Sequence, residues 1–205
     1  MKVVTYQNKK LAYYSIPKVG KTTMKRVMDR ISQPDGQYQN LGDKRFSPML
    51  RWHGRNCIRF TVVRDPIERL ISAYADRVAD RDDIRRSSIS VLLCRLLGLN
   101  PHPTLEEFAL NLHKYYLIND RIYRHVIPQI RYIGKDPSFF DRIFSIRQMD
   151  KVVEYLSGIT GKEILVVKHK NASIARFTAE DLSPLAKERL RDFYRKDYEI
   201  YGKYF

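Results

Sequence analysis

The sequence has few cysteines and no long apolar run. Cys57 and Cys94 are its only two cysteines, and their spacing fits neither a disulfide framework nor a metal site. We therefore expect two small core residues rather than a redox pair. No stretch approaches the roughly 20 consecutive apolar residues of a membrane-spanning helix, and the N-terminus lacks the apolar region of a signal peptide. These absences lead us to expect a soluble, cytoplasmic protein.

Acidic residues are also scarce relative to basic ones. The 205-residue chain has 38 Lys and Arg against 23 Asp and Glu, which gives a formal net charge of +15 at pH 7. Such an excess favours a polyanionic partner: nucleic acid, an acidic polysaccharide, a phosphorylated cofactor or anionic lipid. Charge alone does not distinguish among these four. The length suits one α/β core, so we expect a single domain over residues 1–205.

Apolar, β-forming runs alternate along the chain with amphipathic, helical patterns. This alternation favours an α/β fold, which we expect to be P-loop-like, with three layers and a central, mostly parallel sheet flanked by helices. The predicted strands cover residues 11–16, 58–63, 142–146 and 163–167. The predicted helices cover residues 21–31, 66–74, 149–156 (ended by Gly158) and 183–201, with further helical segments between 80 and 119, one opened by a capping box at 104–107. Residues 32–56 and 77–86 are predicted to be a surface excursion and a solvated, mobile link.

Residues 15–23, Ser-Ile-Pro-Lys-Val-Gly-Lys-Thr-Thr, lie between a predicted strand and a predicted helix. A loop of this kind directs backbone N–H groups and the positive end of the helix dipole at one point, which predicts an anion site. A full Walker A loop has glycine where this chain has Ser15, and Pro17 makes the loop more rigid. We therefore expect an anion that is smaller than a nucleoside triphosphate or differently shaped.

Two stretches of the sequence resemble motifs of one enzyme family. Residues 16–23 resemble the 5′-phosphosulfate loop of sulfotransferases that use 3′-phosphoadenosine 5′-phosphosulfate (PAPS), in particular the Golgi-type carbohydrate (family 2) sulfotransferases. Residues 62–74, Val-Val-Arg-Asp-Pro-Ile-Glu-Arg-Leu-Ile-Ser-Ala-Tyr, are similar to the family's 3′-phosphate motif. Weaker similarities follow at residues 125–129 and 193–199. The resemblance implies transfer of a sulfuryl group from PAPS to a hydroxyl, with adenosine 3′,5′-bisphosphate as the leaving product.

The resemblance also implies which residues hold PAPS. The 5′-phosphosulfate is assigned to Pro17, Lys18, Val19, Gly20, Lys21, Thr22 and Thr23, and Lys18 is the expected donor to the bridging oxygen on which charge builds. The 3′-phosphate is assigned to Arg64 and Ser72. Arg64 follows a buried strand and offers a planar fork to a phosphate, while Ser72 lies about two helical turns further on. A late loop with Lys170 and Ser173 is expected to close over the nucleotide.

The general base that takes the acceptor's proton stays open between two of the five histidines. His53 lies on the excursion shortly before the Arg64 strand, and His125 belongs to the family-like element at residues 125–129. Weaker candidates are His102, His113, His169 and an Asp or Glu of the excursion.

Two further patterns are expected to be structural. Arg69 is expected to form an ion pair with Asp65 or Glu68. A stripe of tyrosines near the C-terminus is expected to be a packing surface; its members are Tyr194, Tyr198, Tyr201 and Tyr204.

Two other classes of function remain open. A P-loop kinase would bind ATP with magnesium, with Thr22 as an ion ligand, but the missing glycine and the match at residues 62–74 count against it. A basic nucleic-acid-binding module would explain the charge, but no helix-turn-helix, zinc or RNA-recognition signature is present. We expect a sulfotransferase that needs no metal and binds no nucleic acid. Its acceptor is expected to be a carbohydrate hydroxyl, and an acidic glycan is one candidate. The family's membrane anchor and stem are absent from the sequence, which favours a bacterial, cytoplasmic setting.

Overall fold

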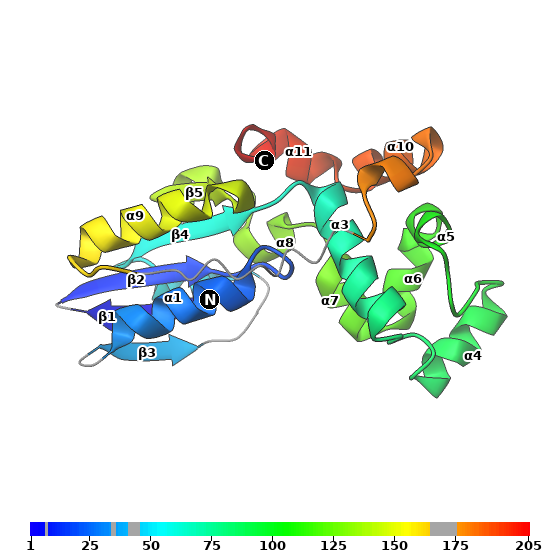
Figure 1. Ribbon diagram of the computed structural model, residues 1–205, viewed down its shortest axis with the longest axis horizontal. Helices are drawn as coiled ribbons and strands as arrows, with labels where there is room; N and C mark the ends of the chain where they lie inside the picture. The colour runs from blue at the N-terminus through cyan, green and yellow to red at the C-terminus, as the bar shows by residue number, and fades with distance from the viewer. Residues whose placement is uncertain (7, 34–35, 41–45, 165–175) are drawn as a thin grey trace. The chain divides into compact units, whose positions relative to one another are not determined.

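The structure is a computed structural model, and it describes residues 1–205 except 7, 34–35, 41–45 and 165–175 and except the side chains of Tyr6 and His53. Its contacts divide the chain into two compact units (Figure 1). The first unit contains Met1–Arg64, Gln129–His169 and Glu199–Phe205, and the second contains Asp65–Pro128 and Lys170–Tyr198. This division does not test the expected single domain, which stays a prediction.

A five-stranded mixed sheet forms the centre of the first unit (Figure 1). The strands are β1 (Lys2–Tyr6), β2 (Lys9–Tyr14), β3 (Gln37–Asn40), β4 (Ile58–Val63) and β5 (Arg142–Ser145), in the spatial order β3-β1-β2-β4-β5. β2, β4 and β5 are parallel, whereas β1 is antiparallel to both β2 and β3. The predicted α/β fold with a central, mostly parallel sheet is therefore confirmed.

Helices cover both faces of this sheet. In the described part of the first unit they are α1 (Lys21–Ser32), α2 (Pro48–His53), α8 (Ile130–Ile133) and α9 (Met149–Thr160). The register of the parallel strands places Tyr14 and Phe144 on opposite faces. The Phe144 ring lies 5.5 Å from the Tyr155 ring of α9, and the Tyr14 hydroxyl donates to the carbonyl of Leu50 in α2 at 2.9 Å. Two helical layers therefore enclose the sheet.

The predicted α1 is confirmed in both its extent and its buried face, which consists of Met24, Val27, Met28 and Ile31. Two other predictions for this unit need correction. The surface excursion predicted at residues 32–56 includes regular structure, β3 and α2, and Leu50 is buried. α9 does not end at Gly158 but continues to Thr160, because Gly161, at φ 67°, provides the left-handed residue that ends a helix readily.

Helices build the described part of the second unit around an apolar core that includes Leu70, Phe108 and Ile122. They are α3 (Pro66–Tyr74), α4 (Ser88–Leu96), α5 (Leu105–Leu110), α6 (Leu112–Ile118), α7 (Asp120–Val126) and α10 (Pro184–Phe193), with a π-helical turn at Ala75–Asp80 after α3. The predicted capping box at Thr104 and Glu107 is confirmed. The predicted helix over 183–201 is interrupted at Tyr194, so that α11 (Arg195–Tyr201) is a separate helix.

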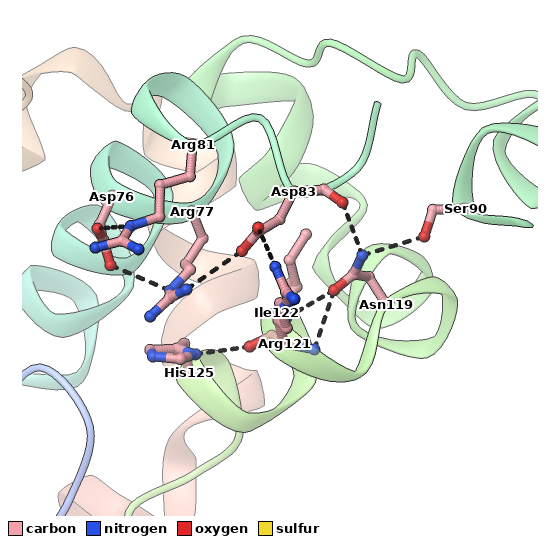
Figure 2. Close-up of polar contacts among 9 residues, drawn as sticks. All are labelled: Asp76, Arg77, Arg81, Asp83, Ser90, Asn119, Arg121, Ile122 and His125. Carbon is pink, nitrogen blue, oxygen red and sulfur yellow. Dashed lines mark hydrogen bonds and ion pairs between the residues drawn. The ribbon is translucent and has the colours of Figure 1, made fainter. Parts of the chain in front are cut away.

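The link at residues 77–86 was expected to be solvated, and this expectation is wrong for its centre. Ile84 is fully buried, and the Asp83 side chain is 3% exposed. The Asp83 carboxylate lies 3.4 Å from Arg77 Nη1 and 3.1 Å from Arg121 Nη1 (Figure 2). Because these guanidinium groups compensate its charge, an acidic residue can lie inside the unit.

The remaining expectations concern single residues and one strand. The tyrosine packing stripe is confirmed at Tyr194 and Tyr201, which are both fully buried. The predicted strand at 163–167 is not formed at Glu163 and Ile164, and its other residues lie outside the described part.

Both cysteines are free thiols; Cys94 is buried as expected, and Cys57 is half-buried. Among the described helices, none has the length and apolar composition needed to cross a membrane.

Candidate active site

The loop between β2 and α1 has the backbone conformation of an anion-binding turn. Lys18 and Gly20 both have positive φ angles, 67° and 75°, on either side of Val19. Gly20 is the N-cap of α1, and as a glycine it offers no side chain to the first-turn N–H groups. The first-turn N–H groups and the positive end of the helix dipole therefore give this loop end the features that suit an anion.

The side chains of this loop divide into two groups. Pro17 and Val19 are buried, and Pro17 has no N–H to donate, so these two residues fix the loop's path. Lys18 and Thr23 are half-buried, whereas Lys21 and Thr22 are exposed. The polar side chains are thus the ones that face outward at the start of α1.

Arg64 lies beside this loop. β2 and β4 are parallel neighbours, so the residues that follow them meet at the same edge of the sheet. Arg64 Nη1 lies 3.5 Å from the carbonyl oxygen of Lys18 and donates to it. The structure therefore brings the Arg64 guanidinium against the backbone of the loop that carries Lys18.

Gln129 holds the backbone of Arg64 in place. Its side-chain Oε1 accepts from the Arg64 N–H at 3.2 Å, and its Nε2 donates to the Arg64 carbonyl at 2.8 Å. The Gln129 side chain is fully buried. Sequence reasoning placed Gln129 in a family-like element without giving it a role; the structure makes it a positioning residue for Arg64.

The helix that carries Ser72 belongs to the second unit. Ser72 is half-buried on α3, and Asp65 caps this helix by accepting from the N–H groups of Ile67 and Glu68 at 2.9 and 3.0 Å. The Tyr198 hydroxyl donates to the other Asp65 oxygen at 2.9 Å. Burial raises the pKa of Tyr198 and the Asp65 carboxylate raises it further, so the phenol stays a donor. Asp65 therefore fixes the start of the α3 helix.

His125 lies at the end of α7 in a defined orientation. Its Nδ1 is 2.6 Å from the carbonyl oxygen of Arg121, as Figure 2 shows. Because a carbonyl oxygen only accepts, Nδ1 carries a proton, so that the lone pair lies on Nε2 whenever the ring is neutral. A histidine in this state can take a proton at Nε2.

Arg69 has a different role from the predicted ion pair with Asp65 or Glu68. Its side chain is fully buried, and its two terminal nitrogens donate to consecutive backbone carbonyls. Nη1 lies 2.8 Å from the carbonyl oxygen of His125, and Nη2 lies 3.3 and 2.5 Å from those of Val126 and Ile127. Arg69 thus fixes the turn that follows His125, a role that sequence spacing gave no means of finding.

The comparison with protein families agrees with this geometry. A sequence model described as the sulfotransferase family matches residues 1–204, nearly the whole chain. The chain belongs to the sulfotransferase family. Neither a curated protein nor a solved structure matches it significantly. Membership makes the protein a transferase of sulfuryl groups, and it confirms the family that residues 16–23 and 62–74 indicated.

Several predicted site residues of the sulfotransferase lie outside the described part. These are Lys170, Ser173, the weaker candidate His169 and the side chain of His53. His102 has its Nδ1 3.9 Å from an Asp82 carboxylate oxygen, at an exposed turn. Of the other predicted site residues, Lys18 and Arg64 lie in the first unit, and Ser72 and His125 lie in the second.

Proposed function

We propose that the sulfotransferase uses PAPS as its donor and a carbohydrate hydroxyl as its acceptor. The observation that carries the proposal is the hydrogen bond from the Arg64 guanidinium to the Lys18 carbonyl, in the loop that leads to the N-cap residue Gly20 of α1. A loop with two positive φ angles supplies backbone N–H groups, and the two side chains supply positive charge. These positively charged and N–H groups match a donor such as PAPS, which has negative charge at its 5′-phosphosulfate and at its 3′-phosphate.

The proposed roles follow the resemblance of residues 16–23 and 62–74 to the family's two motifs. The loop from Pro17 to Thr23 binds the 5′-phosphosulfate, and Arg64 binds the 3′-phosphate with Ser72 as a further hydroxyl donor. Lys18 donates to the bridging oxygen as the bond from that oxygen to sulfur breaks and negative charge builds on it. Lys170 and Ser173 are proposed to contact the nucleotide.

The acceptor's proton needs a base when its oxygen bonds to sulfur. We propose His125 or His53 for this role. The hydrogen bond from His125 Nδ1 to the Arg121 carbonyl supports His125, because it leaves Nε2 as the proton acceptor. Neither residue needs a metal for this step.

The acceptor class and setting are also proposals. The formal charge of +15 supports an acidic glycan as acceptor, since such a chain is attracted to a basic surface. We further propose that the two units act as one sulfotransferase domain in the cytoplasm of a bacterium.

A transfer assay tests this function. PAPS labelled in its sulfuryl group is incubated with neutral and acidic oligosaccharides, and label on the saccharide is measured with and without magnesium. We expect metal-independent transfer that Arg64→Ala abolishes and Arg26→Ala, an exposed arginine on α1, leaves intact. Phosphoryl transfer from ATP that requires magnesium, with no sulfuryl transfer, would show a kinase instead.

A further inference from the structure

A cavity of about 330 Å³ lies on the first unit, away from the phosphate loop. The residues that give it chemical character are Lys10, Gln37, Gln39, Trp52, Arg55 and Asn56. Lys10 is near the start of β2 and Asn56 precedes β4, whereas Lys18 and Arg64 follow the ends of these strands. A six-residue strand spans about 20 Å, so the cavity is a separate site from the proposed reaction centre.

The strand register explains why these side chains meet. Thr5 of β1 pairs with Lys10 on one side and with Gln37 on the other, and Val3 pairs with Gln39. Directly paired residues point to the same face of a sheet, so β1, β2 and β3 present a polar surface there. The same face carries Tyr14, whose hydroxyl bond to Leu50 places α2 against it.

Trp52 and Arg55 form the wall that α2 and its following turn contribute. Trp52 is 57% exposed, an unusual state for so large an apolar ring. The Arg55 guanidinium lies over the indole, 4.7 Å from the ring centroid. Stacking on the indole restricts the motion of the Arg55 guanidinium. Less conformational entropy is therefore lost when the guanidinium binds a carboxylate or a sulfate.

We propose that this cavity binds an acidic saccharide. The amides of Gln37, Gln39 and Asn56 each offer both donors and acceptors, which suits neighbouring hydroxyls on a sugar ring. The indole of Trp52 can pack against the apolar face of the sugar ring. Arg55 and Lys10 can form ion pairs with an acidic group on the same sugar. A groove for single-stranded nucleic acid would instead need successive aromatic platforms along a track of cations. Among the described residues that line this cavity, Trp52 is the one exposed aromatic ring, and it is accompanied by three neutral amides.

The position of the cavity implies a long ligand if the bound saccharide is also the acceptor. A chain of several sugar units held at the start of β2 and β4 could extend toward the loop at their other end. This link to the acceptor rests on the proposed function, whereas saccharide binding at the cavity does not.

Tryptophan fluorescence tests the binding directly, because Trp52 is the only tryptophan in the chain. The probes are a uronate-containing tetrasaccharide, a neutral glucose tetrasaccharide and a single-stranded oligonucleotide, each added to the full chain. We expect a saturable emission change with the acidic tetrasaccharide at lower concentration than with either other probe. No saturable change, equal response to the neutral probe or tighter binding of the oligonucleotide would overturn the proposal.

Matched variants locate the binding. Arg55→Ala is expected to weaken binding of the acidic tetrasaccharide about tenfold or more, because a charge-assisted contact is lost. Gln39→Ala is expected to weaken binding of the same probe, and Arg30→Ala, outside the cavity, is the control for loss of one charge. Circular dichroism checks that each variant is folded. Equal weakening by Arg55→Ala and Arg30→Ala would overturn the assignment to this cavity.

Calorimetry with adenosine 3′,5′-bisphosphate on the same variants separates the two proposals. Arg55→Ala is expected to bind the bisphosphate as the unchanged chain does. Failure of the unchanged chain to bind the acidic tetrasaccharide, with bisphosphate binding intact, contradicts the cavity proposal alone. Failure of the unchanged chain to bind the bisphosphate, with saccharide binding intact, contradicts the proposed function alone.

Discussion

Lys18 combines a left-handed backbone conformation with the side chain that we assign to the bridging oxygen. Its φ of 67° is one that glycine adopts without the steric cost of a Cβ. Lys18→Gly is therefore expected to keep or raise the thermal unfolding temperature while kcat falls about 10²- to 10³-fold, as for other lost donors to developing charge. Steady-state sulfuryl transfer and thermal unfolding measure the two effects.

Lys21→Ala is the control for this prediction, because Lys21 is exposed at the first position of α1. It is expected to lower kcat much less than Lys18→Gly does. An equal loss of kcat in both variants would contradict the assignment of Lys18 to the bridging oxygen.

Gln129 is a second residue whose role can be tested through Arg64. Gln129→Met replaces the amide with an apolar group of similar size. This change leaves the N–H and carbonyl of Arg64 without the Gln129 side chain as their partner. We expect the free energy of unfolding to fall by about 1–3 kcal/mol and binding of adenosine 3′,5′-bisphosphate to weaken. Denaturant unfolding and calorimetry provide the two measurements. Loss of stability with unchanged affinity would show that Gln129 does not position Arg64 for the ligand.

At the scale of elements, Asn119 joins α7 to the link before α4 (Figure 2). Its Oδ1 accepts from the N–H groups of Arg121 and Ile122, and its Nδ2 donates to the Asp83 carbonyl and to the Ser90 hydroxyl. Asn119→Ala removes the cap and both donors, and we expect it to lower the free energy of unfolding by about 2 kcal/mol. Asn119→Asp keeps the cap and is expected to cost less. Equal losses in denaturant unfolding would show that the cap contributes nothing.

The start of β4 and the start of β5 are joined by the Arg59 and Asp141 pair. Arg59 donates to Asp141 Oδ2 from its backbone N–H at 2.7 Å and from Nε at 3.1 Å. Burial raises the pKa of Asp141, but these hydrogen bonds and the guanidinium charge together hold it below its usual value. Because the pKa of this carboxyl is lower in the folded than in the unfolded protein, its ionised form stabilises the fold at pH values above the unfolded pKa. This stability is lost as the pH falls through the folded pKa.

We therefore expect Asp141→Asn to destabilise the protein at neutral pH and to approach the stability of the unchanged chain below about pH 4. Thermal unfolding measured across this pH range checks the prediction, with the exposed Glu154→Gln as the control. A constant difference between Asp141→Asn and the unchanged chain at all pH values would contradict it.

Elements with a strong local signal were predicted correctly, and those that depend on distant partners were not. α1 has a clear apolar face, and β4 is a continuous β-forming run. β3, with its polar sequence Gln-Tyr-Gln-Asn, becomes a strand only because it pairs with β1. Periodicity likewise predicted a helix near α4 but not its exposure: Ile89 and Leu96 are 71% and 72% exposed.

At the scale of the whole molecule, the family could be predicted from sequence because it rests on two local motifs, each of which follows a strand. Residues that follow parallel neighbouring strands meet at one edge, so the closeness of Lys18 and Arg64 could be expected. The bonds from Gln129 to Arg64 join residues 65 positions apart, and local patterns do not show such contacts. The general base depends on contacts of this long-range kind, which is why two histidines remained equal candidates.

Calorimetric titration with adenosine 3′,5′-bisphosphate in the absence of metal tests the central claim most directly. The account predicts saturable binding to the unchanged chain and to Arg26→Ala. It predicts an affinity about 30-fold or more lower in Arg64→Ala, since charge-assisted hydrogen bonds to phosphate are lost. Binding of ATP only with magnesium, or bisphosphate binding that Arg64→Ala leaves unchanged, would contradict a PAPS site built on Lys18 and Arg64.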